Sequence, residues 1–338
     1  MLFFIKKYFS IIIIFIIAII IFKISRIYIE PYYNAKFTNY NYKYPKINEK
    51  FVVSTEPNTS QIPEFIINIL KLAFYDRELI IDHNQPPHII VRFENIKNYK
   101  KPDTYNAPYI TVSAERWTLK RHKYRKNGPP LAEIVSTTPR KLRELYFPFM
   151  AWSRIVPQRV YYNNSNRQQF LVYIASNCVK KREKLFSLIK KLKPDAVALG
   201  VCSNPNKIGV PGGYGNLDHI YAQYNFGFAM ENAQVPGYIT EKIINVFRGG
   251  AIPIYWGDPN INQYFNPKAF INVDQFKNLQ QAAEYIVNLS PAQIKSMQAE
   301  PMFTDNKIPD IFGIVHDPKH PLLQQAATFI RNEYFKQL

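Results

Sequence analysis

The sequence lacks most features of a small secreted, fibrous or zinc-stapled protein. It holds only two cysteines in 338 residues, Cys178 and Cys202, which excludes a disulfide scaffold and a tetrahedral cysteine zinc site. Glycine is sparse, with 12 residues, and there is no collagen period, heptad pattern or internal repeat. A hydrophobic fraction of 47% excludes disorder throughout. The chain is therefore long and apolar enough for about two globular domains.

Acidic residues are also few relative to basic residues. The chain has 25 Asp and Glu against 43 Lys and Arg, which gives a formal charge of +18. Much of the surplus lies in residues 92 to 143 and 180 to 193, without an RNA-binding aromatic signature, a Cys/His finger or a basic heptad helix. We expect most of these side chains to form solvated surface, with a few available for a nucleotide diphosphate or an anionic membrane. Nucleic acid is not expected as a partner.

A long uncharged run does occur at the N-terminus, where residues 8 to 22 read YFSIIIIFIIAIIIF. A helix needs about 20 residues to cross the hydrocarbon core, and flanking lysines can snorkel, so the run predicts a transmembrane helix. No small-residue cleavage site follows it, which favours an uncleaved signal anchor over a secretory signal peptide. The charge on the two flanks only weakly favours a cytoplasmic N-terminus. We expect a cytoplasmic tail in residues 1 to 7, the anchor in 8 to 24 and a stem in 25 to 45.

Short β-branched runs alternate with amphipathic stretches beyond the stem, which is typical of parallel α/β units. The first unit is predicted to have strands at 51–55, 88–93, 108–114 and 133–137 and a helix at 62–75. The second is predicted to have strands at 170–176, 196–201, 226–231, 251–257 and 270–273, and helices at 179–193, 217–224, 239–248 and 279–289. Ligands of such sheets bind outside the carboxyl ends of the strands.

This pattern predicts two Rossmann-like domains that face a cleft. Residues 46 to 155 would form the first domain and residues 156 to 317 the second. A final helix in residues 318 to 338 would pack back on the cleft.

The segment from Met230 to Lys242, MENAQVPGYITEK, is the most informative one for function. An apolar strand ends in a carboxylate and an amide, a Pro-Gly turn follows, and Thr240 opens a helix with Lys242 in its first turn. Free backbone N–H groups, the positive end of the helix dipole and an ammonium group would then lie together, which suits a phosphate. The alternative is that Lys242 points to solvent and Glu241 only caps the helix.

Residues 225 to 276 resemble the donor-binding signature of the α-1,3/4-fucosyltransferase family. The matching pieces are an aromatic-rich strand, Glu231-Asn232, the GYITEK run of residues 237 to 242, AIPIYWG at 251 to 257, and NPKAFI at 266 to 271. A second piece, Ser176-Asn177-Cys178 with Arg182 downstream, is similar to another family segment. This resemblance implies an α/β GT-B fold, GDP-fucose as the donor, and inversion at the fucose anomeric carbon. It also implies that the domain of residues 46 to 155 binds the acceptor and that the domain of residues 156 to 317 binds GDP-fucose.

The resemblance also implies roles for single residues. Arg182 and Lys242 would hold the donor diphosphate, and their guanidinium and ammonium groups suit a leaving group that gains negative charge. Tyr238 and Glu241 would contact ribose and fucose hydroxyls, and the remaining predicted donor-binding residues are Glu231 and Asn232. For Arg182 the alternative is plain surface, since it lies in the run KKREK.

The resemblance places the catalytic base in the first domain. An inverting transfer needs a base to take the proton of the acceptor hydroxyl, and Glu115, at the end of the predicted strand 108–114, is the candidate. Glu94, which ends the neighbouring apolar run, is its rival. The alternative for Glu115 is a surface ion pair with Arg116 or Lys120.

The expected activity is transfer of fucose from GDP-fucose to a hydroxyl of a GlcNAc-type glycan or glycoprotein, in α-1,3 linkage. The alternatives are another GT-B glycosyltransferase with a different nucleotide sugar, or an inactive membrane-tethered glycan-binding relative. No Asp-x-Asp triad is present, so no metal is expected to be required in the active site, and Mn or Mg would be stimulants. The expected location is a type II membrane protein, with a lumenal Golgi-type domain if the source is eukaryotic or viral.

Two covalent features remain open in the sequence. Cys178 and Cys202 end adjacent predicted strands, so a bridge and a pair of buried thiols are both compatible with the pattern. Sequons occur at Asn58, Asn163 and Asn288, and the last precedes Pro291 and should be poorly used.

Overall fold

The structure is a computed structural model that describes residues 50–56, 62–93, 107–114, 129–140, 142–151, 157, 167–206, 208–215, 217–312 and 319–337. The expected tail, anchor and stem lie outside the described residues, as do Glu94 and Glu115 and the sequons at Asn58 and Asn163. Within the described part of the chain, no helix is long and apolar enough to cross a membrane.

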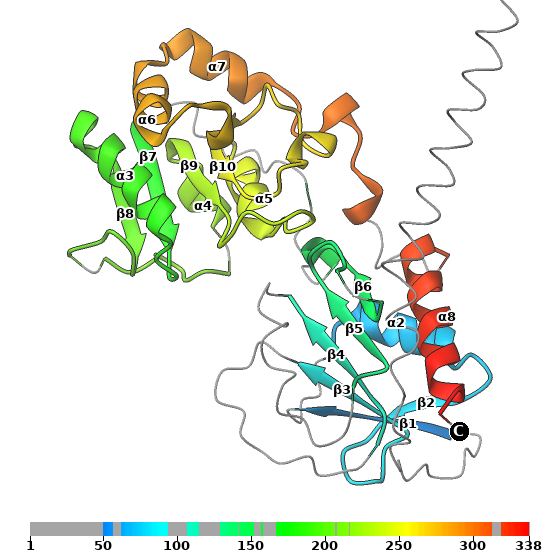
Figure 1. The fold of residues 1–338 in the computed structure, drawn as a ribbon. Helices are drawn as coiled ribbons and strands as arrows, with labels where there is room; N and C mark the ends of the chain where they lie inside the picture. The colour runs from blue at the N-terminus through cyan, green and yellow to red at the C-terminus, as the bar shows by residue number, and fades with distance from the viewer. Residues whose placement is uncertain are drawn as a thin grey trace, which may run out of the picture. The chain divides into compact units, whose positions relative to one another are not determined.

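The first sheet has six parallel strands in the order β2-β1-β3-β4-β5-β6 (Figure 1). The strands are β1 (Lys50–Glu56), β2 (Glu78–Ile81), β3 (Ile89–Phe93), β4 (Tyr109–Ser113), β5 (Ala132–Val135) and β6 (Glu144–Tyr146). Buried β-branched and aromatic side chains fill the four inner strands, which the sequence predicts. The outer strands β2 and β6 are short and half-buried, so their hydrophobic signal is weak and the sequence did not reveal them.

Helices α2 (Glu64–Ala73) and α8 (Pro321–Phe335) pack against each other although they lie far apart in the sequence (Figure 1). From α8, Leu323, Ala326 and Ile330 join the core of the first sheet. Pro321 occupies the first helical turn and the His320 side chain accepts a hydrogen bond from the backbone N–H of Leu322, which fixes where the helix begins.

The second sheet has five parallel strands in the order β11-β10-β9-β7-β8. Its elements follow in chain order: β7 (Gln169–Ala175), α3 (Lys180–Leu192), β8 (Val197–Gly200), α4 (Asp218–Tyr221), β9 (Tyr224–Met230), α5 (Glu241–Arg248), β10 (Ile252–Trp256), β11 (Ile271–Asn272), α6 (Leu279–Asn288) and α7 (Pro291–Ala299). The predicted alternation is confirmed here, and α7 is added to it. The helix expected at 217 to 224 is only one turn long.

Helices cover both faces of the second sheet. Residues of α4 and α5 share one hydrophobic core, and residues of α3 and α6 share the other. The chain runs from β7 to its neighbour β8 on one side and then crosses to β9 on the other side. This reversal makes the carboxyl ends of β7 and β9 the topological switch point, where open α/β sheets bind their ligands.

Candidate active site

A buried carboxylate forms the centre of the site, directly after β9. Glu231 is fully buried, with 0% of its surface exposed. Its Oε1 accepts a hydrogen bond of 2.7 Å from the backbone N–H of Thr240, and the Thr240 hydroxyl lies 2.8 Å from both carboxylate oxygens. Lys242 Nζ donates to Glu231 Oε2 at 2.9 Å and to Thr240 Oγ1 at 2.8 Å. Two of the three N–H groups of the ammonium are therefore held by the protein, and its side chain is 25% exposed.

The Pro-Gly turn and the helix start lie as the sequence predicts. Gly237 has a φ of +81°, a conformation that favours glycine. Thr240 is the N-cap of α5, and its side chain accepts from the backbone N–H of Lys242. Asp258, after β10, fixes the turn because its Oδ2 accepts from the backbone N–H of Gly237 at 3.1 Å.

The neighbouring strand leaves room for the buried carboxylate. A Cβ at Gly257 would lie 2.6 Å from Glu231 Cγ and 2.6 Å from Tyr255 Oη. The backbone N–H of Glu231 donates to the Trp256 carbonyl at 2.6 Å. Only glycine at position 257 lets Glu231 lie this close to β10.

Burial and charge act on the ion pair in opposite directions. Burial raises the pKa of the Glu231 carboxyl, although the Lys242 ammonium opposes this. Burial would lower the pKa of Lys242, but the carboxylates of Glu231 and Glu241 outweigh it and raise that pKa above 10.5. Arg182 is close enough for its charge to act against this rise. Lys242 therefore stays protonated at neutral pH.

Arg182 is the second cation at the switch point. It is only 3% exposed, whereas Lys180 and Lys184 beside it in α3 are exposed. Its Nη2 donates to the Asn177 carbonyl at 2.9 Å and to Asn232 Oδ1 at 2.7 Å. Its Nε is buried and has no hydrogen-bond partner. The burial decides against plain surface for Arg182, and the orphaned donor suits an anionic ligand.

Glu241 and Tyr238 complete the set of predicted donor-binding residues. Glu241 is the first residue of α5, is partly exposed, and has a buried Oε2 without a hydrogen-bond partner. Tyr238 is fully buried. The structure thus brings Arg182, Glu231, Asn232 and Lys242 into one hydrogen-bonded region and places Glu241 at its edge, with an acceptor atom left over for a ligand.

Sequence reasoning missed the supporting residues. Asn177 acts through its backbone carbonyl, and the Asp258 carboxylate accepts from the backbone N–H of Gly237. No residue pattern reveals either contact. Thr240 was expected only as the start of a helix, and its hydroxyl also joins Glu231 to Lys242. An S/T-x-K run after a strand that ends in Glu is the signal that could have indicated this.

Cys178 and Cys202 form a disulfide, with Cα atoms 5.2 Å apart. It ties the turn before α3 to the end of β8, next to the Asn177 carbonyl that holds Arg182. Among the described residues, Glu183 and these two cysteines have the spacing of metal ligands. Disulfide sulfurs are not the thiolates that bind metal, and the Glu183 carboxylate accepts from Tyr173 and Ser203.

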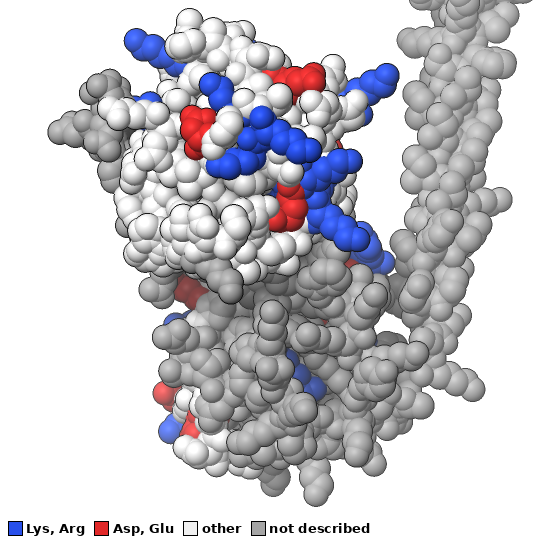
Figure 2. Space-filling view, turned by 90° about the vertical axis from the view of Figure 1, so that its left-hand side faces the viewer, with Lys and Arg blue, Asp and Glu red and all other residues white. Residues whose placement is uncertain are grey.

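The lysines of α3 lie on the outside of the second sheet. Figure 2 shows Lys and Arg side chains gathered on this face, and those of α3 that are exposed are Lys180, Lys184, Lys190 and Lys191. They agree with the predicted solvated surface.

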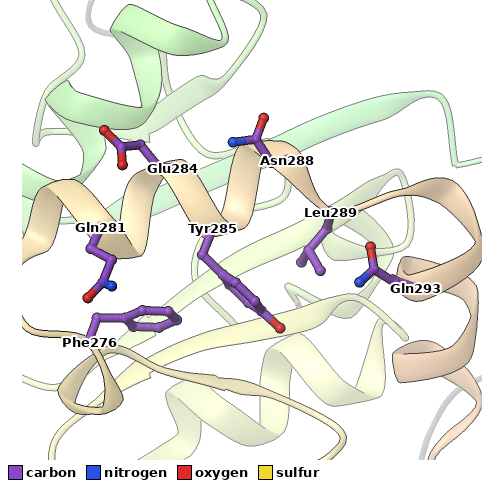
Figure 3. A pocket seen from close by; sticks show the side chains of 7 residues that line it. All are labelled: Phe276, Gln281, Glu284, Tyr285, Asn288, Leu289 and Gln293. Atoms are coloured by element: carbon purple, nitrogen blue, oxygen red, sulfur yellow. The ribbon is translucent and has the colours of Figure 1, made fainter.

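A separate pocket lies between α6 and the start of α7 (Figure 3), with a volume of about 310 Å³. It is lined by Phe276, Gln281, Glu284, Tyr285, Asn288, Leu289 and Gln293, none of which is a predicted site residue. Asn288 of the third sequon is exposed there, and Ser290 forms a capping box with Gln293 at the start of α7.

Comparison with known proteins finds similarity to the fucosyltransferases that the sequence motifs resemble. Residues 164–297 match the family model described as glycosyltransferase family 10 (fucosyltransferase), C-terminal part. An α-(1,3)-fucosyltransferase of Helicobacter pylori is 36% identical over 182 residues, which cover 53% of this chain and 32% of that protein. GDP-fucose protein O-fucosyltransferase 3 of Xenopus tropicalis is 32% identical over 127 residues, which cover 35% of this chain and 27% of that protein.

The fold extends further than the sequence match. The crystal structure of an α1,3-fucosyltransferase with GDP-fucose has a TM-score of 0.54 to this chain at 19% identity, and the match covers 83% of this chain and 93% of that one. The match in sequence spans only about a third of the curated relatives. The α/β fold with two parallel sheets is therefore that of a solved fucosyltransferase, and the predicted resemblance to the fucosyltransferase family is confirmed, with residues 164–297 as the part that carries it.

Proposed function

We propose that this protein is an inverting glycosyltransferase that moves fucose from GDP-fucose to a hydroxyl of a GlcNAc-type glycan in α-1,3 linkage. The observation that carries the proposal is the pair of cations at the switch point of the second sheet. Among the residues that the structure describes, Arg182 Nε has no hydrogen-bond partner, and Lys242 Nζ donates to two acceptors, so that its third N–H group is left for a ligand. Both lie beside the N-terminus of a helix, which favours a diphosphate.

The cations would act on the leaving group. As the acceptor oxygen forms its bond to the fucose anomeric carbon, the bond from that carbon to the diphosphate breaks and GDP gains negative charge. Lys242 and Arg182 are held in place before the reaction, so they stabilise this charge without reorganisation. A base must take the proton of the acceptor hydroxyl, and we assign this role to Glu115 on the resemblance.

Glu241 would bind the donor sugar. Its buried Oε2 lacks a hydrogen-bond partner, and a buried acceptor without a partner costs roughly 1 to 3 kcal/mol. A fucose hydroxyl that donates to this oxygen would remove that cost. This is the role that the resemblance gives to Glu241.

Calorimetric titration with GDP and UDP tests the donor class. We expect GDP to bind and UDP to bind at least tenfold more weakly. UDP binding in the micromolar range without GDP binding would favour another GT-B glycosyltransferase. GDP binding without turnover of GDP-fucose on any acceptor would favour the inactive glycan-binding relative.

The acceptor needs a test of its own, because the relatives include enzymes named for glycan and for protein fucosylation. Transfer of labelled fucose to GlcNAc-terminated oligosaccharides should exceed transfer to unglycosylated protein. The reverse preference would replace the glycan acceptor with a protein acceptor. Activity that survives EDTA would agree with the proposed absence of a required metal.

We also propose, from the sequence of residues 8 to 24, that the protein is a type II membrane protein. Full-length protein expressed in cells should stay in the membrane pellet after alkaline carbonate treatment. Release into the supernatant would contradict an anchor.

A further inference from the structure

The two residues that follow β9 reach opposite faces of the second sheet. Successive side chains of a strand alternate between its faces. Phe228 and Met230 lie in the core formed with α3 and α6, whereas Ala229 lies in the core formed with α5. When this alternation continues past the end of the strand, Glu231 falls on the side of α5 and Asn232 on the side of α3.

Each of these residues holds the cation on its own side. Glu231 Oε2 accepts from Lys242 of α5 at 2.9 Å, and Asn232 Oδ1 accepts from Arg182 of α3 at 2.7 Å. Two consecutive residues thus set the positions of two cations that lie 60 residues apart in the sequence. No local pattern could bring these cations together.

Glu231 has no free atom to offer a ligand. It is fully buried, and both carboxylate oxygens are engaged by Thr240 and Lys242. It can therefore influence a bound donor only through Lys242. Because a lysine side chain is long and flexible, fixing its ammonium group in one place reduces the entropy lost when an anion binds.

Asn232 restricts Arg182 in a similar way. Arg182 Nη2 uses its two hydrogens on Asn232 and on the Asn177 carbonyl. The guanidinium plane is then fixed, and Nε has no hydrogen-bond partner among the described residues. A planar donor group fixed in this way can bind phosphate oxygens with defined geometry.

We propose that Glu231 and Asn232 are positioning residues, Glu231 for Lys242 and Asn232 for Arg182, which prepare the two cations for the donor diphosphate. This inference rests on the proposed function, because it takes the diphosphate as the ligand of both cations. It differs from the expectation that Glu231 itself contacts the donor. The negative charge of Glu231 weakens the attraction of Lys242 for phosphate, and the proposal is that orientation outweighs this loss.

Double-mutant cycles on the full chain, read out as the calorimetric Kd for GDP, test the proposal. Glu231→Gln should weaken GDP binding roughly tenfold, the scale of one charge-assisted hydrogen bond. In a Lys242→Met background, Glu231→Gln should alter Kd by less than about twofold, because Glu231 influences the ligand only through the Lys242 ammonium group, which this background lacks. Asn232→Ala should likewise weaken GDP binding when Arg182 is present and should have little effect on Kd in an Arg182→Met background.

Cross-pairs and a surface variant are the controls. Glu231→Gln and Arg182→Met belong to different pairs, so their effects on Kd should come closer to multiplying than those of Glu231→Gln and Lys242→Met. Glu284→Gln changes an exposed carboxylate on α6 and should leave Kd unchanged. If Glu231→Gln does not fold, Glu231→Asp keeps the charge but shortens the reach to Lys242, and it should weaken GDP binding in the same background-dependent way.

Unchanged or tighter GDP binding by Glu231→Gln would overturn the positioning role. So would an equal loss of GDP affinity from Glu231→Gln in the wild-type and Lys242→Met backgrounds. In that case wild type still binds GDP and Lys242→Met still weakens it, so the proposed function survives. A wild-type protein that does not bind GDP would overturn both.

Discussion

Each of the two sheets contains a buried carboxylate paired with a cation, and the two pairs differ in how much of the cation stays accessible. In the first sheet, Arg92 Nε donates to Glu56 Oε2 at 2.6 Å, and the side chains are 6% and 10% exposed. In the second sheet, Lys242 is 25% exposed while Glu231 is 0% exposed. Both side chains of the first pair are shielded from solvent, whereas in the second pair only the cation is partly exposed to solvent.

The surroundings explain the difference. The Arg92 guanidinium lies 3.9 Å from the centre of the Tyr109 ring, so a neighbouring strand covers it. Lys242 instead lies in the first turn of α5 at the switch point, where its side chain stays partly exposed. The Glu56–Arg92 pair is therefore part of the packed interior of the first sheet, whereas the ammonium group of the Glu231–Lys242 pair is accessible to a ligand.

The largest effect is expected for Glu115, the proposed base. Glu115→Gln keeps the shape but removes the basicity, so kcat should fall roughly 10² to 10⁴-fold while the Kd for GDP stays the same. Steady-state kinetics with a good fucosyl acceptor and calorimetry with GDP measure the two quantities. Glu94→Gln is the matched control. If kcat falls strongly in Glu94→Gln and stays near the wild-type value in Glu115→Gln, the base is Glu94.

Arg92→Met should affect stability and leave donor binding unchanged. It removes one partner of a buried ion pair, which costs about 3 to 5 kcal/mol of unfolding free energy. Urea unfolding measures this loss, and the double variant Glu56→Leu with Arg92→Met should recover most of it. A weakened GDP affinity in the folded Arg92→Met protein would contradict the division of roles between the two pairs.

The two pairs should also differ in alkaline solution. The pKa of Lys242 is raised in the folded protein, so its stabilising contribution is fully present below pH 10.5 and is lost as the pH rises through the folded pKa. The stability difference between wild type and Lys242→Met should then shrink by up to about 1.4 kcal/mol per pH unit. Arginine does not titrate in this range, so the difference between wild type and Arg92→Met should stay constant. Urea unfolding at pH 8 to 11 compares the two.

The smallest effect is expected for the exposed pair between Arg331 of α8 and Asp76, which follows α2. The hydrogen bond from Arg331 lowers the pKa of Asp76 below 3.8, so its contribution is present above that pH and is lost as the pH falls through the folded pKa. Solvent screens the pair, whose side chains are 26% and 36% exposed. Asp76→Asn should cost less than about 1 kcal/mol at pH 7 and less again at pH 2. A cost of several kcal/mol in thermal unfolding would contradict this.

The alternation of strands and helices, the Pro-Gly turn and the helix capped by Thr240 could all be predicted from the sequence. These features follow from local causes, namely the period of apolar residues, a glycine at positive φ and an N-cap hydroxyl. The short strands β2 and β6 were missed because half-exposed strands of three or four residues carry little periodic signal.

The contacts at the switch point could not be predicted from the sequence and follow from the three-dimensional fold. That Cys178 bonds to Cys202, that Asn232 holds Arg182 and that Asp258 fixes Gly237 all depend on strand order and register. Strand order brings β7 and β9 side by side although about 50 residues separate them in the sequence. Such contacts join segments that are far apart in the sequence, so residue types and spacing do not determine which residues meet. The packing of helices on both faces of the sheet determines which of the possible contacts form.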